Sequence, residues 1–173
     1  MLAPFVTAGA VTGQDEPPYV PFVPMPEEVV QEMLEIAQVS ARDIVYDLGS
    51  GDGRIVIAAA KRFGARAVGI EIDPDLVRDS IADADQAGVS HLVRFIEGDI
   101  FAMHISPATV VTLFLLPEFN RRLLPKLLAE LRPGTRIVSY KYPLGDWAPE
   151  KTVPVSRGTV YSWVVPPHAR QSH

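Results

Sequence analysis

A glycine-rich turn between an apolar run and an alanine-rich run is the feature that most limits what this chain can fold into. The turn, residues 49–53, reads Gly-Ser-Gly-Asp-Gly and follows the short apolar run 44–48. Glycine adopts left-handed backbone angles at little cost and lets the main chain approach a ligand closely. Residues 54–63, which Gly64 ends, are typical of a helix whose first N–H groups face that ligand. We therefore expect a strand, a ligand-binding turn and a helix.

Short apolar runs and helical runs continue to alternate along the chain. We expect further strands at 67–71, 92–96, 109–115 and 135–141, separated by helices, with helices beginning at 26, 74 and 117. Pro125 should kink the helix 117–131 or divide it into two short ones. The last two β-type runs, 152–155 and 159–165, are too close for a helix between them and form a hairpin. The pattern predicts an α/β fold: a doubly wound, mostly parallel seven-stranded sheet with a C-terminal antiparallel hairpin.

The N-terminal region is rich in proline, with five prolines between residues 16 and 26. Such a density favours an extended strap, which either covers the core or forms a lid over a ligand site. We expect residues 1–15 to be a flexible tail or the remnant of an export signal, residues 16–166 to form the one domain, and residues 167–173 to be a tail. The basic region of an export signal is missing, since the first Lys or Arg is Arg42, and we expect a cytoplasmic protein.

Composition argues against several classes of protein. The net charge of −5 disfavours a general nucleic-acid binder, which needs a basic face to displace counterions from phosphates. The chain has no cysteine, and its four histidines lack metal-ligand spacing, so we expect no metal site. No apolar run approaches the roughly 18 residues of a membrane span, so we expect no membrane insertion.

Three acidic residues and the spacing of the turn select among nucleotide-like ligands. A dinucleotide fingerprint needs glycine where Arg54 stands. Asp47 would repel a pyrophosphate but suits a ligand with ammonium and sulfonium charges. Glu71, at the end of the second strand, is placed to accept hydrogen bonds from ribose hydroxyls, and Asp99, after the third strand, from an adenine amine. Since the carboxyl ends of parallel strands share one edge, the three acids should converge there.

These residues resemble the cofactor site of class I S-adenosylmethionine-dependent methyltransferases. The segments 19–24, 44–53, 109–116 and 131–139 more specifically resemble the archaeal broad-specificity protein lysine methyltransferases and the mitochondrial lysine methyltransferases of the ATP synthase c-subunit. The resemblance covers about residues 18–165, and it departs at Met25, where the relatives favour threonine. It implies an enzyme that transfers a methyl group from S-adenosylmethionine to exposed protein lysines and releases S-adenosylhomocysteine. It also implies that the cofactor is bound by Asp47, Gly49, Ser50, Gly51, Gly53, Glu71, Asp99 and Ile100.

The segment after the fourth strand bears on the acceptor. Enzymes that methylate amide or nucleobase nitrogens carry Asn/Asp-Pro-Pro-Tyr/Phe at this place, whereas residues 115–118 read Leu-Leu-Pro-Glu. A lysine must instead lose its proton, and an apolar slot lowers its pKa from the usual value of about 10.4. No general base is identified, and Glu118 is a candidate by position only. Aromatic residues at such places are more often core, but the slot candidates are Tyr19, Phe114, Leu116, Tyr140 and Trp147.

The sequence is compatible with three functions. The leading hypothesis is a monomeric protein-lysine N-methyltransferase without nucleic-acid partners. The alternatives are a small-molecule methyltransferase of the same fold and a non-catalytic S-adenosylmethionine-binding module. A nicotinamide oxidoreductase is disfavoured by Arg54 and Asp47.

Overall fold

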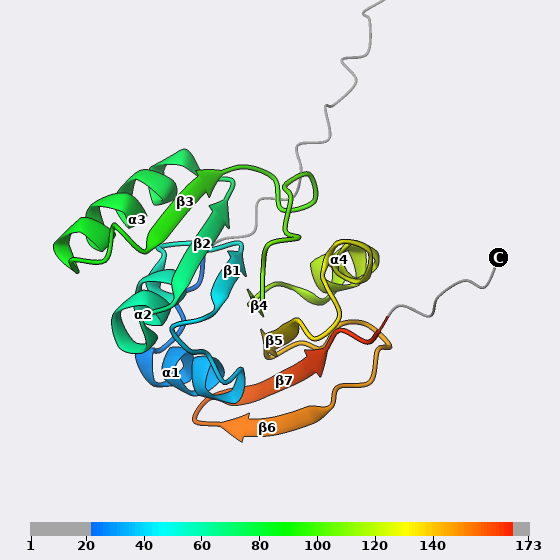
Figure 1. Ribbon diagram of the computed structural model, residues 1–173. Coiled ribbons are helices and arrows are strands. Elements are labelled where there is room, and N and C mark those ends of the chain that lie inside the picture. The colour runs from blue at the N-terminus through cyan, green and yellow to red at the C-terminus, as the bar shows by residue number, and fades with distance from the viewer. Residues whose placement is uncertain (1–21, 168–173) are drawn as a thin grey trace, which may run out of the picture.

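The apolar runs of the sequence form the central strands of one seven-stranded sheet (Figure 1). The structure is a computed structural model that describes residues 22–167. The helices in this range are α1 (Glu27–Ile36), α2 (Arg54–Phe63), α3 (Pro74–Gln86) and α4 (Pro117–Glu130). The strands are β1 (Ile44–Leu48), β2 (Arg66–Glu71), β3 (Val93–Glu97), β4 (Val110–Leu113), β5 (Arg136–Tyr140), β6 (Lys151–Val155) and β7 (Gly158–Val164). The expected tail 1–15, most of the strap and residues 168–173 lie outside the described residues.

The strands lie in the order β3-β2-β1-β4-β5-β7-β6. Pairs from β3 to β5 are parallel, while β7 is antiparallel to both β5 and β6, so the expected doubly wound sheet with a terminal hairpin is confirmed. The chain winds outward from β1 to β3 and then returns to β4 on the other side of β1. The carboxyl ends of β1 and β4 therefore flank the switch point at which such sheets bind ligands.

Helices cover both faces of the sheet because strand side chains alternate in direction. On one face Val45, Val110 and Val138 pack against α1 and α2, with α3 beside α2 (Figure 1). On the other face α4 covers Val111 and Ile137. Burial on both faces explains why the central strands read as continuous apolar runs.

The structure excludes one of the two effects expected of Pro125, the division of α4 into two short helices. Pro125 does not divide this element, which is a single helix from Pro117 to Glu130. Proline lacks an N–H group and leaves the carbonyl of Arg121, four residues earlier, without its helical partner. Both residues are exposed, so water can hydrate that carbonyl, while Leu123 and Leu127 anchor the opposite face in the core.

The connection between β3 and β4 differs from the expected alternation of strands and helices, because no helix separates these two strands. Residues 98–109 form turns rather than a helix. This connection is still anchored, since Ile105 and Ala108 are buried in the cluster beneath α4. Short polar and glycine-containing stretches between these anchors favour turns over a helix.

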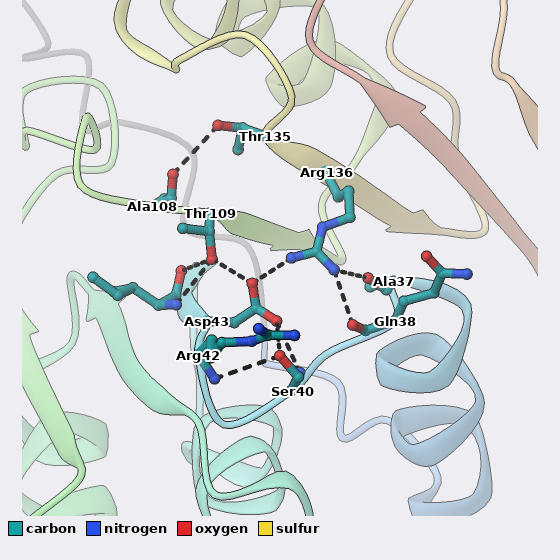
Figure 2. A network of polar contacts seen from close by, with 10 residues as sticks. Ala37, Gln38, Ser40, Arg42, Asp43, Ala108, Thr109, Thr135 and Arg136 are labelled. Atoms are coloured by element: carbon teal, nitrogen blue, oxygen red, sulfur yellow. Dashed lines mark hydrogen bonds and ion pairs between the residues drawn. The ribbon is translucent and has the colours of Figure 1, made fainter.

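A polar network joins the amino ends of the central strands to the end of α1 (Figure 2). The buried carboxylate of Asp43 accepts hydrogen bonds from the Thr109 hydroxyl, at 2.7 Å, and from the Ser40 main chain, at 2.8 Å. It also pairs with Arg136, whose guanidinium donates to the carbonyl oxygens of residues 37 and 38, at 2.9 Å each. The network thus ties β1, β4 and β5 to α1 at the edge of the sheet opposite the switch point.

Candidate active site at the switch point

The glycine turn after β1 occupies the place that the sequence predicts for it. Gly49, Gly51 and Gly53 all have positive φ, of +80°, +54° and +75°, a region that disfavours residues with a Cβ. The N–H groups of Gly49 and Ser50 donate to the carbonyl of Ile70, at 2.9 and 3.0 Å. These bonds bend the turn across the end of β2 and bring it against Glu71.

Glu71 organises the backbone around it. One carboxylate oxygen accepts the N–H of Gly51 at 2.8 Å, and the other accepts those of Ile72 and Asp73 at 2.8 and 3.1 Å. A carboxylate has about four acceptor positions, so this one can accept further hydrogen bonds. Glu71 therefore links the glycine turn to the start of α3 and retains capacity for a ligand hydroxyl.

Asp47 is buried at the end of β1, with 3% of its surface exposed. Burial raises the pKa of its carboxyl to about 7; the hydrogen bond from the Thr112 hydroxyl opposes this, and the charges of Glu71 and Asp52 add to it. A carboxyl with a pKa near neutrality gains its charge readily when a cation arrives beside it. This suits a ligand that carries an ammonium group.

The remaining predicted cofactor residues differ in what their side chains offer. The Ser50 hydroxyl is buried, lacks a hydrogen-bond partner among residues 22–167 and points toward Gly69 of β2. Asp99 is exposed after β3 and accepts the N–H of Phe101 at 2.9 Å, which leaves its other oxygen open. The N–H of Gly98 donates to the carbonyl of Glu71 at 2.9 Å. This bond brings the backbone of Asp99, the next residue, close to that of Glu71. Ile100 is half-buried against the α4 side of the sheet.

The structure brings together some of the slot candidates. The rings of Phe114 and Tyr140 meet at the ends of β4 and β5, with centroids 5.0 Å apart and planes at 59°. Burial raises the pKa of the Tyr140 hydroxyl, which donates to the carbonyl of Arg157 at 2.8 Å. Leu116 is partly exposed just before α4. Tyr19 lies outside the described residues.

Trp147 is not part of this group. It packs on the α4 side of the sheet, whereas Phe114 and Tyr140 pack on the α1 side. Its ring lies 5.9 Å from that of Trp163, whose indole N–H donates to the Trp147 carbonyl at 2.9 Å. The expectation that Trp147 joins Phe114 in one slot is therefore wrong, because sequence spacing alone does not tell on which face of the sheet a loop residue packs.

Two residues near the turn were not found from the sequence. A Cβ on Gly51 would lie 2.3 Å from the ring of Phe22, and one on Gly49 would lie 2.9 Å from Leu115. Phe22, at the described end of the strap, thus covers the turn, while Met25 beside it is buried in the core. Of the two interpretations of the strap, core cover is confirmed at Met25, whereas a lid over a ligand stays a prediction, which the position of Phe22 on the glycine turn favours. In the sequence, Phe22 is an aromatic residue within a proline-rich segment. That pattern does not show that its ring lies against Gly51.

A surface groove adjoins the glycine turn at Asp52. This groove of about 650 Å³ runs among α1, α2 and α3, lined by charged side chains of both signs, including Glu27, Arg54 and Lys61. Its mixed charge indicates no particular ligand. We place the candidate site at the switch point instead, because Asp47, Glu71 and the glycine turn meet there.

Metal sites and membrane spans are both absent from residues 22–167. No cluster of three or more histidine or acidic side chains in this range has the geometry to hold a metal ion. None of the helices in the same range combines the length and the apolar character that a bilayer crossing requires.

A family model described as the ANTKMT methyltransferase domain matches residues 47–151, more than half of the chain. The chain belongs to this methyltransferase family. The match begins at Asp47 and includes the glycine turn, Glu71 and both rings of the aromatic pair. The resemblance stated from the sequence is confirmed.

Individual relatives agree with this assignment. The methyltransferase is 49% identical to a protein-lysine N-methyltransferase of Saccharolobus islandicus, over 87% of this chain and 97% of that protein. It is 37% identical to the ATP synthase c-subunit lysine N-methyltransferase of Xenopus laevis, and the match spans 83% of this chain but 62% of that protein's length. Among solved structures, an RNA methyltransferase of Salinibacter ruber in complex with S-adenosyl-L-homocysteine is 53% identical. That comparison has a TM-score of 0.83 and covers 87% of this chain and 98% of the other.

Proposed function

We propose that this methyltransferase transfers the methyl group of S-adenosylmethionine to the ε-amino groups of protein lysines and releases S-adenosylhomocysteine. The observation that carries the proposal is the 49% identity to the Saccharolobus islandicus protein-lysine N-methyltransferase over nearly the whole of that protein. The site at the switch point is consistent with both halves of this reaction, donor binding and lysine binding.

The residues at the switch point fit the methyl donor. S-adenosylmethionine supplies an electrophilic methyl group on a positively charged sulfur. The remaining acceptor position of Glu71 suits a ribose hydroxyl, and the uncommitted oxygen of Asp99 suits the adenine amine. Asp47 carries a carboxyl that ionises near neutrality, which favours the ammonium group of the donor.

The acceptor half of the site is apolar. Phe114 and Leu116 follow β4, and Tyr140 is the last residue of β5. The segment after β4 also includes Leu115, which contacts the glycine turn. An apolar surrounding disfavours the charged form of a lysine, so it helps the amine lose its proton before attack. The rest of the rate enhancement then comes from holding nitrogen, carbon and sulfur in line. The proposal assigns no general base.

RNA is a second candidate acceptor, because the Salinibacter ruber relative with 53% identity is described as an RNA methyltransferase. Two features of this chain favour protein. Its net charge is −5, whereas RNA binding draws on a basic surface. Residues 115–118, Leu-Leu-Pro-Glu, also offer few polar groups for reading the edge of a nucleobase. We therefore propose a protein acceptor. We also propose that the enzyme is a monomer and that it acts in the cytoplasm, where the donor is made.

The proposal is tested with radiolabelled S-adenosylmethionine and four acceptors: lysine-rich proteins, the same proteins with acetylated lysines, total RNA and small amines. We expect label in the untreated proteins only, at residues that mass spectrometry identifies as methyl-lysine. A Glu71→Ala enzyme purified in parallel controls for contaminating activity. Label in RNA or in small amines, with none in protein, would refute the lysine assignment.

A further inference from the structure

Lys141, directly after β5, places a positive charge on the aromatic pair of the acceptor half-site. Its ammonium nitrogen lies 5.6 Å from the ring centroid of Phe114 and 5.5 Å from that of Tyr140. Both distances are within the range of about 6 Å over which an aromatic face attracts a cation. Within residues 22–167 Lys141 takes part in no ion pair, so the aromatic faces are its described partners.

The backbone at Lys141 is strained. Its φ is +67°, a left-handed conformation that residues with a Cβ seldom adopt. The N–H of Tyr142 donates to the carbonyl of Tyr140 at 2.9 Å, which closes a three-residue turn around Lys141. A glycine would adopt this turn without strain, yet the chain has a lysine there. Strain of this kind persists only where the surroundings enforce it, and it is concentrated at functional sites.

Buried polar groups enforce the turn. The Ser139 hydroxyl donates to the carbonyl of Tyr142 at 2.6 Å. The amide of Asn120, from α4, donates to the carbonyls of Tyr142 and Pro143 at 3.1 and 3.3 Å. Asn120 and Ser139 are fully buried, and the N–H of Lys141 donates to Thr159 of β7 at 2.8 Å. Three elements thus fix the backbone at Lys141, from which its side chain reaches the rings.

The aromatic pair lies beside the proposed donor site. Phe114 immediately precedes Leu115, whose side chain contacts the turn at Gly49. A substrate lysine that approaches a methyl group held at this turn arrives at the same edge of the sheet. Phe114 is half-buried, whereas Tyr140 is 2% exposed. The face of Phe114 beneath Lys141 is therefore the one that an incoming ammonium can reach.

We propose that the face of Phe114, backed by the buried ring of Tyr140, forms the platform that receives the substrate lysine, and that Lys141 is a resident cation which the substrate must displace. The inference rests on the proposed lysine acceptor and deepens it, because it names the residue that sets the apparent affinity for substrate. An occupant of the platform reduces the fraction of enzyme that can bind substrate, and the apparent dissociation constant rises in proportion.

The test compares Lys141→Met with wild type in steady-state assays on a lysine-containing peptide. Methionine replaces the four-carbon stem of lysine with an unbranched apolar chain of the same number of atoms and removes the charged ammonium group. We expect KM for the peptide to fall by about two- to fivefold, the factor that a cation–π contact at an exposed site supplies. The dissociation constant of S-adenosylmethionine should not change. The control is Lys151→Met, which removes an exposed charge at the end of β6 far from the turn that contacts Tyr140. An unchanged or higher KM in Lys141→Met, or the same fall in the control, would overturn the inference.

A binding measurement separates this inference from the proposed function. Calorimetry measures the affinity of the full chain, with S-adenosylhomocysteine present, for acetyl-Gly-Lys-Gly-amide. Tighter binding by Lys141→Met and by Lys141→Gly supports a displaced resident cation, even if wild type methylates no protein lysine. The glycine variant also relieves the backbone strain, so it remains informative if the methionine variant folds poorly. Equal binding by wild type and both variants would refute the resident cation, whatever acceptor the enzyme uses.

Discussion

The hydroxyl of Thr112 donates a 2.7 Å hydrogen bond to the carboxylate of Asp47, from β4 to β1, at the point where the sheet reverses its winding. The two residues are paired in the parallel register of these strands, and both are buried. This contact orients the carboxyl that we place beside the ammonium group of the donor. Its protonation is therefore the property of the site most open to measurement.

Donor affinity should depend on pH through Asp47. Since the pKa of this carboxyl is raised to about 7, a cationic ligand must displace its proton below that pH. We expect the dissociation constant of S-adenosylmethionine to be up to about tenfold higher at pH 6 than at pH 8. Calorimetry at both pH values measures the difference. Asp47→Asn, which keeps the size of the side chain, should bind weakly at both, and a variant with the wild-type pH dependence would rule out Asp47 as its source.

The hydroxyl of Thr112 should set the pH at which this change occurs. Its hydrogen bond lowers the pKa of Asp47, so Thr112→Val should shift the midpoint of the affinity profile to higher pH. Thr112→Ser retains a hydroxyl and should keep the wild-type midpoint.

The raised pKa of Asp47 also affects the stability of the wild-type protein. Between about pH 4 and pH 7 the Asp47 carboxyl keeps a proton in the folded protein that it has lost in the unfolded chain. The contribution of Asp47 to the free energy of unfolding therefore falls as pH rises through this window.

Glu71 should contribute to both donor binding and local structure. Removing its carboxylate takes away the proposed ribose acceptor and the partner of three backbone N–H groups. We expect Glu71→Ala to weaken donor affinity by one to two orders of magnitude, about 1.4 kcal/mol per tenfold, in calorimetric titrations. Asp83→Ala removes an exposed acid on α3 and serves as the control. Wild-type donor affinity in Glu71→Ala would contradict the ribose assignment.

Gly53 and Gly88 offer a matched pair of substitutions. Their φ angles are nearly equal, +75° and +73°, so alanine pays a similar left-handed penalty of about 1–2 kcal/mol at either position. A Cβ on Gly53 would also lie 2.7 Å from Phe95 and 2.8 Å from the Ser80 hydroxyl. A Cβ on Gly88 would meet no other side chain or backbone segment within 4 Å. Urea denaturation should show a larger loss in the free energy of unfolding for Gly53→Ala. Equal losses would show that Phe95 and Ser80 move away from the new Cβ without a further loss in the free energy of unfolding.

The network around Asp43 should carry a large share of stability. Removing one partner of a buried ion pair costs about 3–5 kcal/mol, and we expect Asp43→Ala to be near 3 because Arg136 is partly exposed to water. Burial opposes ionisation of Asp43, but hydrogen bonds from Thr109 and Ser40 and the charge of Arg136 hold its pKa below the usual value. Its contribution is thus present above about pH 4 and lost as pH falls through the lowered pKa. Chemical denaturation at pH 7 and pH 3 measures this.

A surface ion pair provides the comparison for the Asp43 network. Arg157 and Glu28 lie 3.8 Å apart with most of both side chains exposed. Glu28→Ala should cost less than about 1 kcal/mol at either pH, because water screens the pair. A loss at Asp43 no larger than this would contradict the role of the network.

The order of helices and strands could be read from the chain because each element carries its own local signal. β1 and α2 were predicted with the bounds that the structure has, since a continuous apolar run, a glycine turn and a glycine stop lie next to one another. The positions of Asp47 and Glu71 at one edge of the sheet were also predicted, because the carboxyl ends of parallel strands share that edge. Pro125 was expected to kink or divide its helix, and only the structure shows that it does not divide it, because the effect of a proline depends on whether the carbonyl it frees faces water.

Only the tertiary structure decided which distant side chains meet at the site. The glycine turn and the acids at strand ends were determined by the chain itself, because their positions follow from periodicity and from single residues. The contact of Phe22 with Gly51, the side of the sheet that Trp147 takes and the position of Lys141 over Phe114 depend on packing between elements far apart in sequence. Such contacts leave no periodic signal, because they are set by the shape of the folded core rather than by local backbone preference.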